Sequence, residues 1–208
     1  VTPSEIYQYD IGLNSSKIYK KSQANFKSED YEMRQEFYLS KDSTMIPIFI
    51  AYKKGIPFDM ERPTLLYGYG GFNIPIKPYF KKSNIILLES GGVYASANIR
   101  GGSEYGQEWH EGGMLLNKQN VFDDFIYAAK YLFREGISSP EFLAIKGGSN
   151  GGLLVGAVVN QRPDLFRVAF PEVGVMDMLR YEKFTIGHAW AVEYGTVNNK
   201  TFFENLIK

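Results

Sequence analysis

The stretch FLAIKGGSNGGLLV, residues 142–155, decides the fold. Residues 142–146 are mostly apolar and typical of a buried strand, and the small and apolar residues from Gly152 onward are typical of a helix. Between them stands the pattern G-x-S-x-G, with Ser149 at its centre. A strand that turns directly into a helix strains the residue at the apex, and glycine two positions before and after it relieves the crowding. The sequence therefore predicts a serine hydroxyl held up at a tight turn.

A serine in this position suits acyl transfer, because the N-terminus of the following helix favours developing negative charge. The reaction also needs an oxyanion hole, which is a set of donors fixed where the carbonyl oxygen becomes negative. At such turns one donor is the backbone N–H of the next residue, here Asn150, and the other comes from the loop after the third strand. The matching loop, YGYGGFN (residues 67–73), holds Tyr69 among glycines. The alternative is a glycine-rich turn with an incidental serine and ordinary aromatic residues at a strand end.

Two β-rich runs separated by the polar turn 40–44 predict an antiparallel hairpin of residues 36–39 and 45–53. Pro47 lies inside the second run and lacks an N–H, so we expect it at a sheet edge or in a bulge. The segment 78–90 fits either a helix closed by glycines or a short strand.

The clearest helix pattern runs from Phe122 to Phe133, where apolar residues recur every three or four positions. We expect Asn120 to cap its start, Asp123 and Asp124 to favour its positive end and Gly136 to end it. Strand and helix patterns then alternate with short connections, which predicts a parallel sheet with helices on both faces. The other expected strands are 64–67, 93–99, 142–146 and 166–170, and a second helix is expected at about 152–160.

The two ends of the chain differ from its middle. Residues 1–34 are polar and rich in Lys, Ser and Tyr, with short strand candidates at 6–11 and 17–20, so we expect a connector or the edge of another domain. Near the C-terminal end, the pattern predicts Thr201 as a helix cap, and only the first residues of an apolar helical stripe follow it. Because the chain also starts without Met, we expect it to be a fragment.

Composition excludes several classes of protein. The 208 residues carry 23 Lys+Arg against 23 Asp+Glu, and this neutral balance argues against nucleic-acid binding. No apolar run approaches the roughly 20 residues that span a bilayer, and no secretion signal is visible, so we expect no membrane insertion and a cytoplasmic location. With no Cys, and with His110 and His188 far apart, we expect neither a metal site nor a cofactor.

Several strings in the same order resemble the prolyl oligopeptidase family of serine peptidases. They are LYGYGGFN (66–73), ANIRGGSEYG (97–106), GGSNGGLLV (147–155), QRPDLF (161–166), VGVMDM (173–178) and IGHAW (186–190). The resemblance runs from about residue 35 to the end. It implies that residues 35–208 form an α/β-hydrolase sheet lacking its last strands and helices. Residues 1–34 would then be the last stretch of a β-propeller and its link to the peptidase domain.

The resemblance also implies roles for single residues. Ser149 matches the nucleophile, while Tyr69, through its hydroxyl, and Asn150, through its N–H, match the oxyanion donors. Trp190 matches the indole that stacks on the substrate proline, although alone it would also suit a core position. The other residues of that pocket match Phe72, Val175 and Tyr194. Proline presents a rigid apolar ring without an N–H, so a slot of aromatic faces selects it by shape and burial.

The implied activity is hydrolysis of short proline-containing peptides on the carboxyl side of proline, through an acyl-enzyme. Serine needs a general base, and in this fold the order along the chain is Ser, acid, His. Only His188 follows Ser149, and Asp177 or Glu182 would have to orient it. We favour the alternative that the family's Asp and His lie beyond Lys208. On that interpretation these residues alone hydrolyse nothing at a useful rate.

Other functions on the same fold stay open. They include an oligopeptidase for basic residues, an acylaminoacyl peptidase and an esterase. The aromatic pocket favours proline over a basic side chain, which would call for buried carboxylates. A hypothesis from another class is a non-catalytic module that binds proline peptides and has no base.

Overall fold

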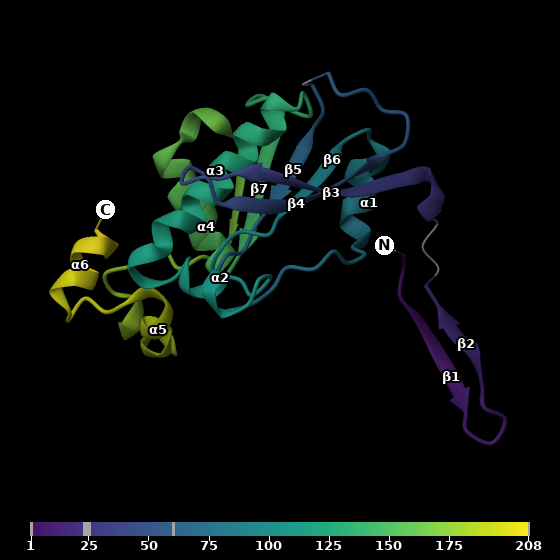
Figure 1. Ribbon diagram of the computed structural model, residues 1–208, viewed down its shortest axis with the longest axis horizontal. Helices are drawn as coiled ribbons and strands as arrows, with labels where there is room; N and C mark the ends of the chain where they lie inside the picture. Colours follow the sequence, from purple (N-terminus) through teal and green to yellow (C-terminus); the bar gives the residue numbers. More distant parts are fainter. Residues whose placement is uncertain (1, 23–25, 60, 208) are drawn as a thin grey trace.

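The computed structural model describes residues 2–22, 26–59 and 61–207. The body of the chain is a six-stranded sheet with the order β3-β4-β6-β5-β7-β8 (Figure 1). Strands β5 to β8 pair in parallel, and β4 is antiparallel to both of its neighbours. The strands are β3 (Tyr31–Leu39), β4 (Met45–Lys53), β5 (Thr64–Tyr67), β6 (Val93–Ala97), β7 (Leu143–Gly148) and β8 (Val168–Glu172).

Helices cover both faces of this sheet. The helices of the described residues are α1 (Lys82–Glu89), α2 (Gln107–Glu111), α3 (Lys118–Arg134), α4 (Asn150–Gln161), α5 (Ala191–Tyr194) and α6 (Lys200–Leu206), of which α1, α3 and α4 pack against the strands. On β6, Tyr94 and Ser96 line a cavity with residues of α1, whereas Ala95 and Ala97 belong to the main core with α3 and α4. Because side chains alternate across a strand, α1 lies on the opposite face from α3 and α4. This arrangement confirms the predicted α/β fold.

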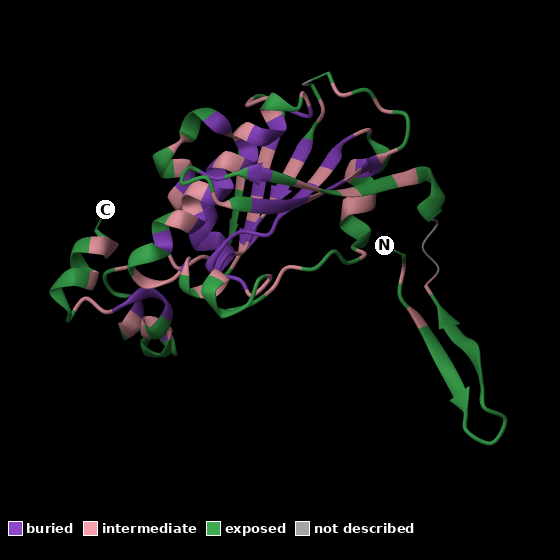
Figure 2. Cartoon of the chain, viewed as in Figure 1, coloured by how far each residue is buried: buried purple, intermediate pink, exposed green. Residues whose placement is uncertain are grey.

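The main core fills the space between the sheet and helices α3 and α4, where Figure 2 shows the buried residues gathered. Leu66 and Ile145 of the central strands, Phe125 and Leu132 of α3 and Leu154 of α4 are each at most 1% exposed. Burying a side chain of this size stabilises a fold by about 1.5–3 kcal/mol. The elements on both sides of the turn between β7 and α4 are therefore anchored in this core.

Helix α3 confirms the predicted apolar spacing but corrects its start. The helix begins at Lys118, and the predicted cap Asn120 instead donates from its side chain to a carbonyl of the preceding loop at 2.9 Å. Asp124 does not serve the helix terminus either, because its carboxylate is fully buried against Arg100. Gly136, with φ of 68°, ends the helix as predicted.

The predicted β3–β4 hairpin is confirmed, but the expectation for Pro47 is wrong. Strand β4 lies inside the sheet, and its register with β3 shows no bulge. Pairing with β6 starts only at Ile48, opposite Ala97, and the Pro47 carbonyl accepts from the N–H of Asn98 at 2.9 Å. In a strand, the backbone N and C=O of one residue point to the same side. The Pro47 nitrogen therefore faces β6 at the end of the β4–β6 pairing, where no N–H is needed.

The structure settles one ambiguous segment and corrects the predicted start of one strand and the predicted cap of one helix. The ambiguous segment 78–90 contains helix α1, which Gly91 closes with φ of 77°. Strand β3 begins at Tyr31, earlier than the expected residue 36. Helix α6 exists, but Asn199 caps it instead of Thr201, since the Asn199 side chain accepts from two backbone N–H groups at its start.

Strands β1 (Glu5–Asp10) and β2 (Ser15–Lys21) form a separate antiparallel hairpin, close to the two expected strands. Figure 1 shows it standing away from the main sheet, and Figure 2 shows it exposed on both strands. Across the described residues, no helix has both the length and the apolar character needed to cross a membrane.

Candidate active site

Ser149 occupies the turn between β7 and α4 with φ of 57° and ψ of −118°. This conformation is rare for a residue with a side chain and confirms the predicted strained turn. The flanking glycines are required by space, because a Cβ on Gly147 would lie 2.2 Å from the carbonyl oxygen of Gly151. A Cβ on Gly151 would lie 2.7 Å from the Gly68 carbonyl oxygen. The serine itself is exposed, so the turn presents its hydroxyl to solvent.

The loop after β5 brings Tyr69 to this hydroxyl. The Ser149 side chain lies close enough to the Tyr69 phenol to lower its pKa. Burial raises the pKa of the phenol, the Ser149 side chain opposes that rise, and the Glu193 carboxylate adds to it. The raised pKa keeps the phenol protonated at neutral pH. Tyr69 is therefore able to donate to an oxyanion formed beside the serine.

Asn150 is the first residue of α4, where a backbone N–H precedes the first intrahelical bonds. Its side chain is buried and donates from Nδ2 to the Tyr69 carbonyl at 2.6 Å. A Cβ on Gly71 would lie 2.5 Å from this Nδ2 atom, so the loop needs glycine there. The hydrogen bond from the Asn150 side chain to the Tyr69 carbonyl therefore connects the two residues that are predicted to supply the oxyanion donors.

A buried polar cluster lies behind these donors. The Lys118 ammonium donates to the Gly70 carbonyl at 2.9 Å, to Asn150 Oδ1 at 3.1 Å and to Glu193 Oε1 at 3.2 Å. Glu193 Oε2 also lies 2.8 Å from His110 Nε2. Burial lowers the pKa of the Lys118 ammonium, and the Glu193 carboxylate works against that fall. We call Lys118 and these partners the Lys118 cluster.

The four residues predicted for the proline slot come together in one apolar cluster. Phe72 and Tyr194 meet edge to face with their ring centroids 5.6 Å apart. Trp190 and Val175 pack against the same group, which also contains Leu153 of α4. The sequence analysis missed further members, namely Tyr181, Met178 and Leu206. This cluster starts one helical turn from the serine, because the N–H of Leu153 donates to the Ser149 carbonyl at 3.2 Å.

The structure gives His188 no bond to the serine among the described residues. His188 is exposed, and the two carboxylates considered as its partners are engaged elsewhere. Asp177 accepts from Arg180 Nε at 2.6 Å, and Glu182 accepts from the Thr196 hydroxyl at 2.9 Å. No hydrogen bond joins a histidine or a carboxylate side chain to the Ser149 hydroxyl in the described part of the chain.

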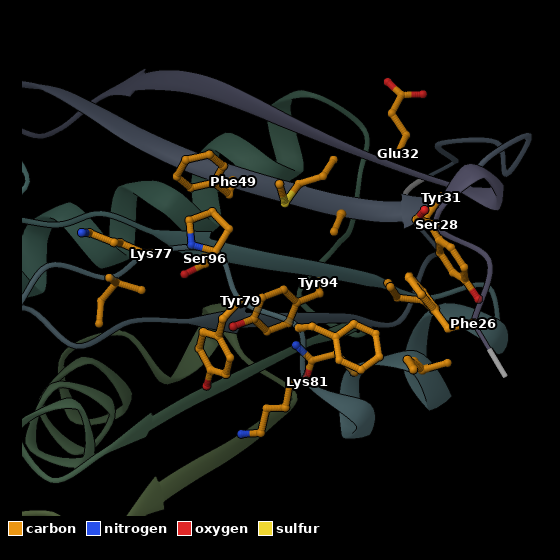
Figure 3. Close-up of a pocket in the computed structure, with 18 residues that line it drawn as sticks. Phe26, Ser28, Tyr31, Glu32, Phe49, Lys77, Tyr79, Lys81, Tyr94 and Ser96 are labelled. Carbon is orange, nitrogen blue, oxygen red and sulfur yellow. The ribbon is translucent and has the colours of Figure 1, made fainter. Parts of the chain in front are cut away.

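A separate cavity of about 130 Å³ lies on the α1 face of the sheet. Figure 3 shows aromatic side chains, among them Phe49, Tyr79 and Tyr94, around it. None of the residues predicted for the active site lines this cavity. It is therefore distinct from the aromatic cluster near Ser149.

A serine at a strand-to-helix turn, on a sheet of this order and faced by a phenol, defines an α/β-hydrolase. The model of the prolyl oligopeptidase family matches residues 78–208 of the chain. The chain belongs to this family, as its motifs predict.

The relatives and solved structures that match the chain agree with this family. It is 52% identical over 207 residues to a prolyl endopeptidase of Elizabethkingia meningoseptica, covering 99% of this chain and 29% of that protein. A prolyl endopeptidase of Dictyostelium discoideum is 50% identical over 212 residues, covering 100% of this chain and 28% of the relative.

Among solved structures, one from an analysis of two prolyl endopeptidases superposes with a TM-score of 0.93 at 46% identity. That match covers 99% of this chain and 30% of the other. A post-proline cleaving enzyme from Rickettsia typhi gives a TM-score of 0.92 at 42% identity, covering 98% of this chain and 30% of that one. The chain therefore spans less than a third of the proteins that it matches.

Proposed function

We propose that the chain carries the nucleophile, the oxyanion hole and the proline slot of a serine endopeptidase that cleaves short peptides after proline. The observation that carries this proposal is the position of Ser149 between two features. Its hydroxyl meets the Tyr69 phenol, and the aromatic cluster around Trp190 and Tyr194 starts one helical turn away. A proline ring seated in that cluster would bring its own carbonyl to the serine. The names of the relatives support the same specificity.

The chemistry follows from these groups. Ser149 Oγ attacks the carbonyl carbon of the proline residue and loses its proton to a general base, while the carbonyl π electrons move to the oxygen. The Tyr69 hydroxyl and the Asn150 N–H stabilise that oxyanion. The intermediate collapses, the C–N bond breaks, and the base returns the proton to the leaving amine. Water then hydrolyses the acyl-enzyme by the same route and frees Ser149.

We propose that the general base is not one of residues 1–208, so that this chain alone is inactive. The support is that the Ser149 hydroxyl has no histidine or carboxylate partner in the described part of the chain. Removing the base from a serine hydrolase lowers turnover by about a million-fold. Assaying the isolated chain on a chromogenic proline peptide tests this. Turnover at ordinary peptidase rates that Ser149→Ala abolishes would make His188 the candidate base.

The proposed activity is tested on the full-length gene product with three matched substrates that end in proline, arginine or an acylated residue before the scissile bond. We expect the proline substrate to be preferred and Ser149→Ala to remove its hydrolysis. A serine-directed phosphonate should label Ser149. A protein that binds proline peptides but takes no label would instead be a binding module, and preference for another substrate would indicate another peptidase or esterase.

We also propose that residues 1–34 are the end of a β-propeller and its link to the peptidase domain at residues 35–208, with the last residues of the link entering the main sheet at Tyr31, where β3 begins. The support is the β1–β2 hairpin, which forms its own sheet and exposes all seven residues of β2. Hydrogen exchange on the full-length gene product tests this, because a hairpin paired within a propeller would be protected. Exchange at the rate of an unpaired hairpin would contradict the proposal.

A further inference from the structure

Lys118 is an unusual lysine, because only 7% of its surface is exposed and its charge is enclosed. Each of the three N–H donors of its ammonium has one acceptor, on Gly70, Asn150 and Glu193. The same ammonium lies 5.4 Å from the ring centroid of Tyr194. The charge is therefore fully partnered, and its position is set by segments far apart in the sequence.

Those acceptors belong to the three parts of the site. Gly70 follows Tyr69 in the loop that presents the phenol. Asn150 provides the second oxyanion donor, and its side chain also accepts from the Tyr194 hydroxyl at 3.0 Å. Glu193 stands on α5, next to Tyr194 of the aromatic slot. One ammonium thus joins the phenol loop, the serine turn and the slot helix.

We infer that Lys118 is the positioning residue of the oxyanion hole, holding the Tyr69 loop and the Asn150 side chain at one point. The inference rests on the function proposed above. Lys118 makes no hydrogen bond to the serine hydroxyl, and its contact with the slot is limited to the Tyr194 ring, so it acts on the oxyanion through Tyr69 and Asn150. Its effect should therefore fall on the transition state, where the oxyanion exists, and spare the binding of the ground state.

Lys118 could instead serve only to stabilise the fold by pairing its buried charge. The test must separate this structural role from the positioning of the oxyanion donors. Lys118→Met leaves Glu193 buried without its partner, which is strongly destabilising by itself. The double variant Lys118→Met/Glu193→Gln removes both charges together and keeps the side-chain volumes. Lys130→Met is the matched control, since Lys130 lies on the same helix over the Tyr127 ring, away from the site.

In the full-length gene product we expect the double variant to lower kcat about 10- to 100-fold with KM within about 3-fold, because misplaced donors act on the transition state. A peptide aldehyde ending in prolinal adds Ser149 Oγ to its carbonyl and forms an oxyanion-like adduct. Its affinity should fall by the same factor as kcat/KM, while a product peptide ending in proline should bind unchanged. Lys130→Met should match the wild type.

Several results would overturn the inference. A double variant with wild-type kcat and aldehyde affinity would leave Lys118 a structural role only. Equal losses for the aldehyde and the product peptide would mean that it supports the slot instead of the oxyanion hole. A crystal structure of the double variant gives a readout without turnover, and we expect the Asn150 Nδ2 bond to the Tyr69 carbonyl to be lost and the Tyr69 hydroxyl to move away from the Ser149 hydroxyl. An unchanged position of Tyr69 and Asn150 would overturn the inference even in an inactive protein, whereas a wild type that hydrolyses no proline peptide would contradict only the proposed function.

Discussion

Two basic side chains are buried in the described part of the chain, Arg100 and Lys118, and their surroundings differ in kind. Arg100 binds Asp124 through Nε at 3.0 Å and a terminal nitrogen at 2.7 Å, and it reaches Asp42 at 2.6 Å. Lys118 has a single carboxylate, on Glu193, and two neutral oxygens. We call Arg100 with its two aspartates the Arg100 cluster.

The two clusters join different parts of the molecule. The Arg100 cluster ties the turn of the β3–β4 hairpin to helix α3, which are elements of the fold. The planar guanidinium suits this task, because its fixed fork holds two carboxylates at once. The Lys118 cluster joins the phenol loop to the serine turn and the slot helix. The contrast predicts that breaking the first cluster lowers stability and that disturbing the site around the second lowers rate.

The largest effect is expected from Arg100→Met. The substitution leaves Asp124 fully buried without its cation, and breaking such a pair costs about 3–5 kcal/mol. We expect a loss of this size in the free energy of unfolding of the peptidase domain, measured by denaturant titration of the full-length gene product. Well below the melting temperature, kcat should stay near the wild-type value.

Arg134→Met is the matched control for that loss. Arg134 is the last residue of α3, its side chain is 67% exposed, and it pairs with Glu135 at 3.0 Å. A pair at this exposure contributes at most about 1 kcal/mol. Equal losses for the two arginine variants, or a large fall in kcat for Arg100→Met alone, would contradict the division between fold and site.

The next effect concerns Tyr69→Phe, which removes one hydroxyl beside Ser149. Loss of a single oxyanion donor lowers kcat by about 10²–10³. We expect that loss with KM and melting temperature unchanged, since the ring keeps its packing. Tyr67→Phe is the control, because Tyr67 lines a cavity on the α1 face instead of the site. A Tyr69→Phe variant with wild-type kcat would exclude the phenol as a donor.

Sequence reasoning found the parts of this site that depend on local structure. The Ser149 turn is specified by glycines two residues away on each side, and the apolar spacing of α3 is equally local. Lys118 was missed because an isolated lysine at a helix start suggests a solvated side chain. Its burial is created by Gly70, Asn150 and Glu193, which are distant in the sequence. No pattern along the chain signals that meeting.

The helix cap and the strand proline were missed for the same physical reason. Asn120 is the right residue type for a cap, but the helix begins before it at Lys118, and its side chain binds the preceding loop, whose course depends on the tertiary fold. Pro47 is tolerated inside the sheet because the β6 ladder ends beside it. In both cases the partner of one backbone or side-chain group decides the outcome, and this partner is not local.

A smaller effect is expected in the slot. Trp190→Leu keeps an apolar side chain and removes the aromatic face, and an aromatic contact is worth about 0.5–1.5 kcal/mol beyond its buried area. We expect kcat/KM for a proline substrate to fall about 2- to 12-fold relative to an alanine substrate. Phe184→Leu is the control, since Phe184 lies in the same segment and is 57% exposed. An unchanged ratio of the two substrates would remove Trp190 from the slot.

The smallest effect is the pH dependence that the rim of the Arg100 cluster gives to stability. Burial alone would raise the pKa of Asp42, but hydrogen bonds from Arg100 and Thr44 outweigh it and hold the pKa at about 2, against an ordinary 3.8. A carboxylate with a lowered pKa in the folded state stabilises the fold above pH 3.8, and this contribution is lost as the pH falls toward 2. Because the Asp42 side chain is 46% exposed, solvent screening limits the contribution to less than about 1 kcal/mol.

Asp42→Asn should therefore narrow its stability deficit against the wild type as the pH falls through this window. The measurement is the free energy of unfolding of both proteins, from above pH 3.8 down to about 2. Kinetic constants at neutral pH should be the same for the two proteins, because Asp42 belongs to the fold side of the contrast. A deficit that stays constant with pH would mean that the Arg100–Asp42 pair adds no stability. A fall in kcat would instead place Arg100 and Lys118 in one coupled network.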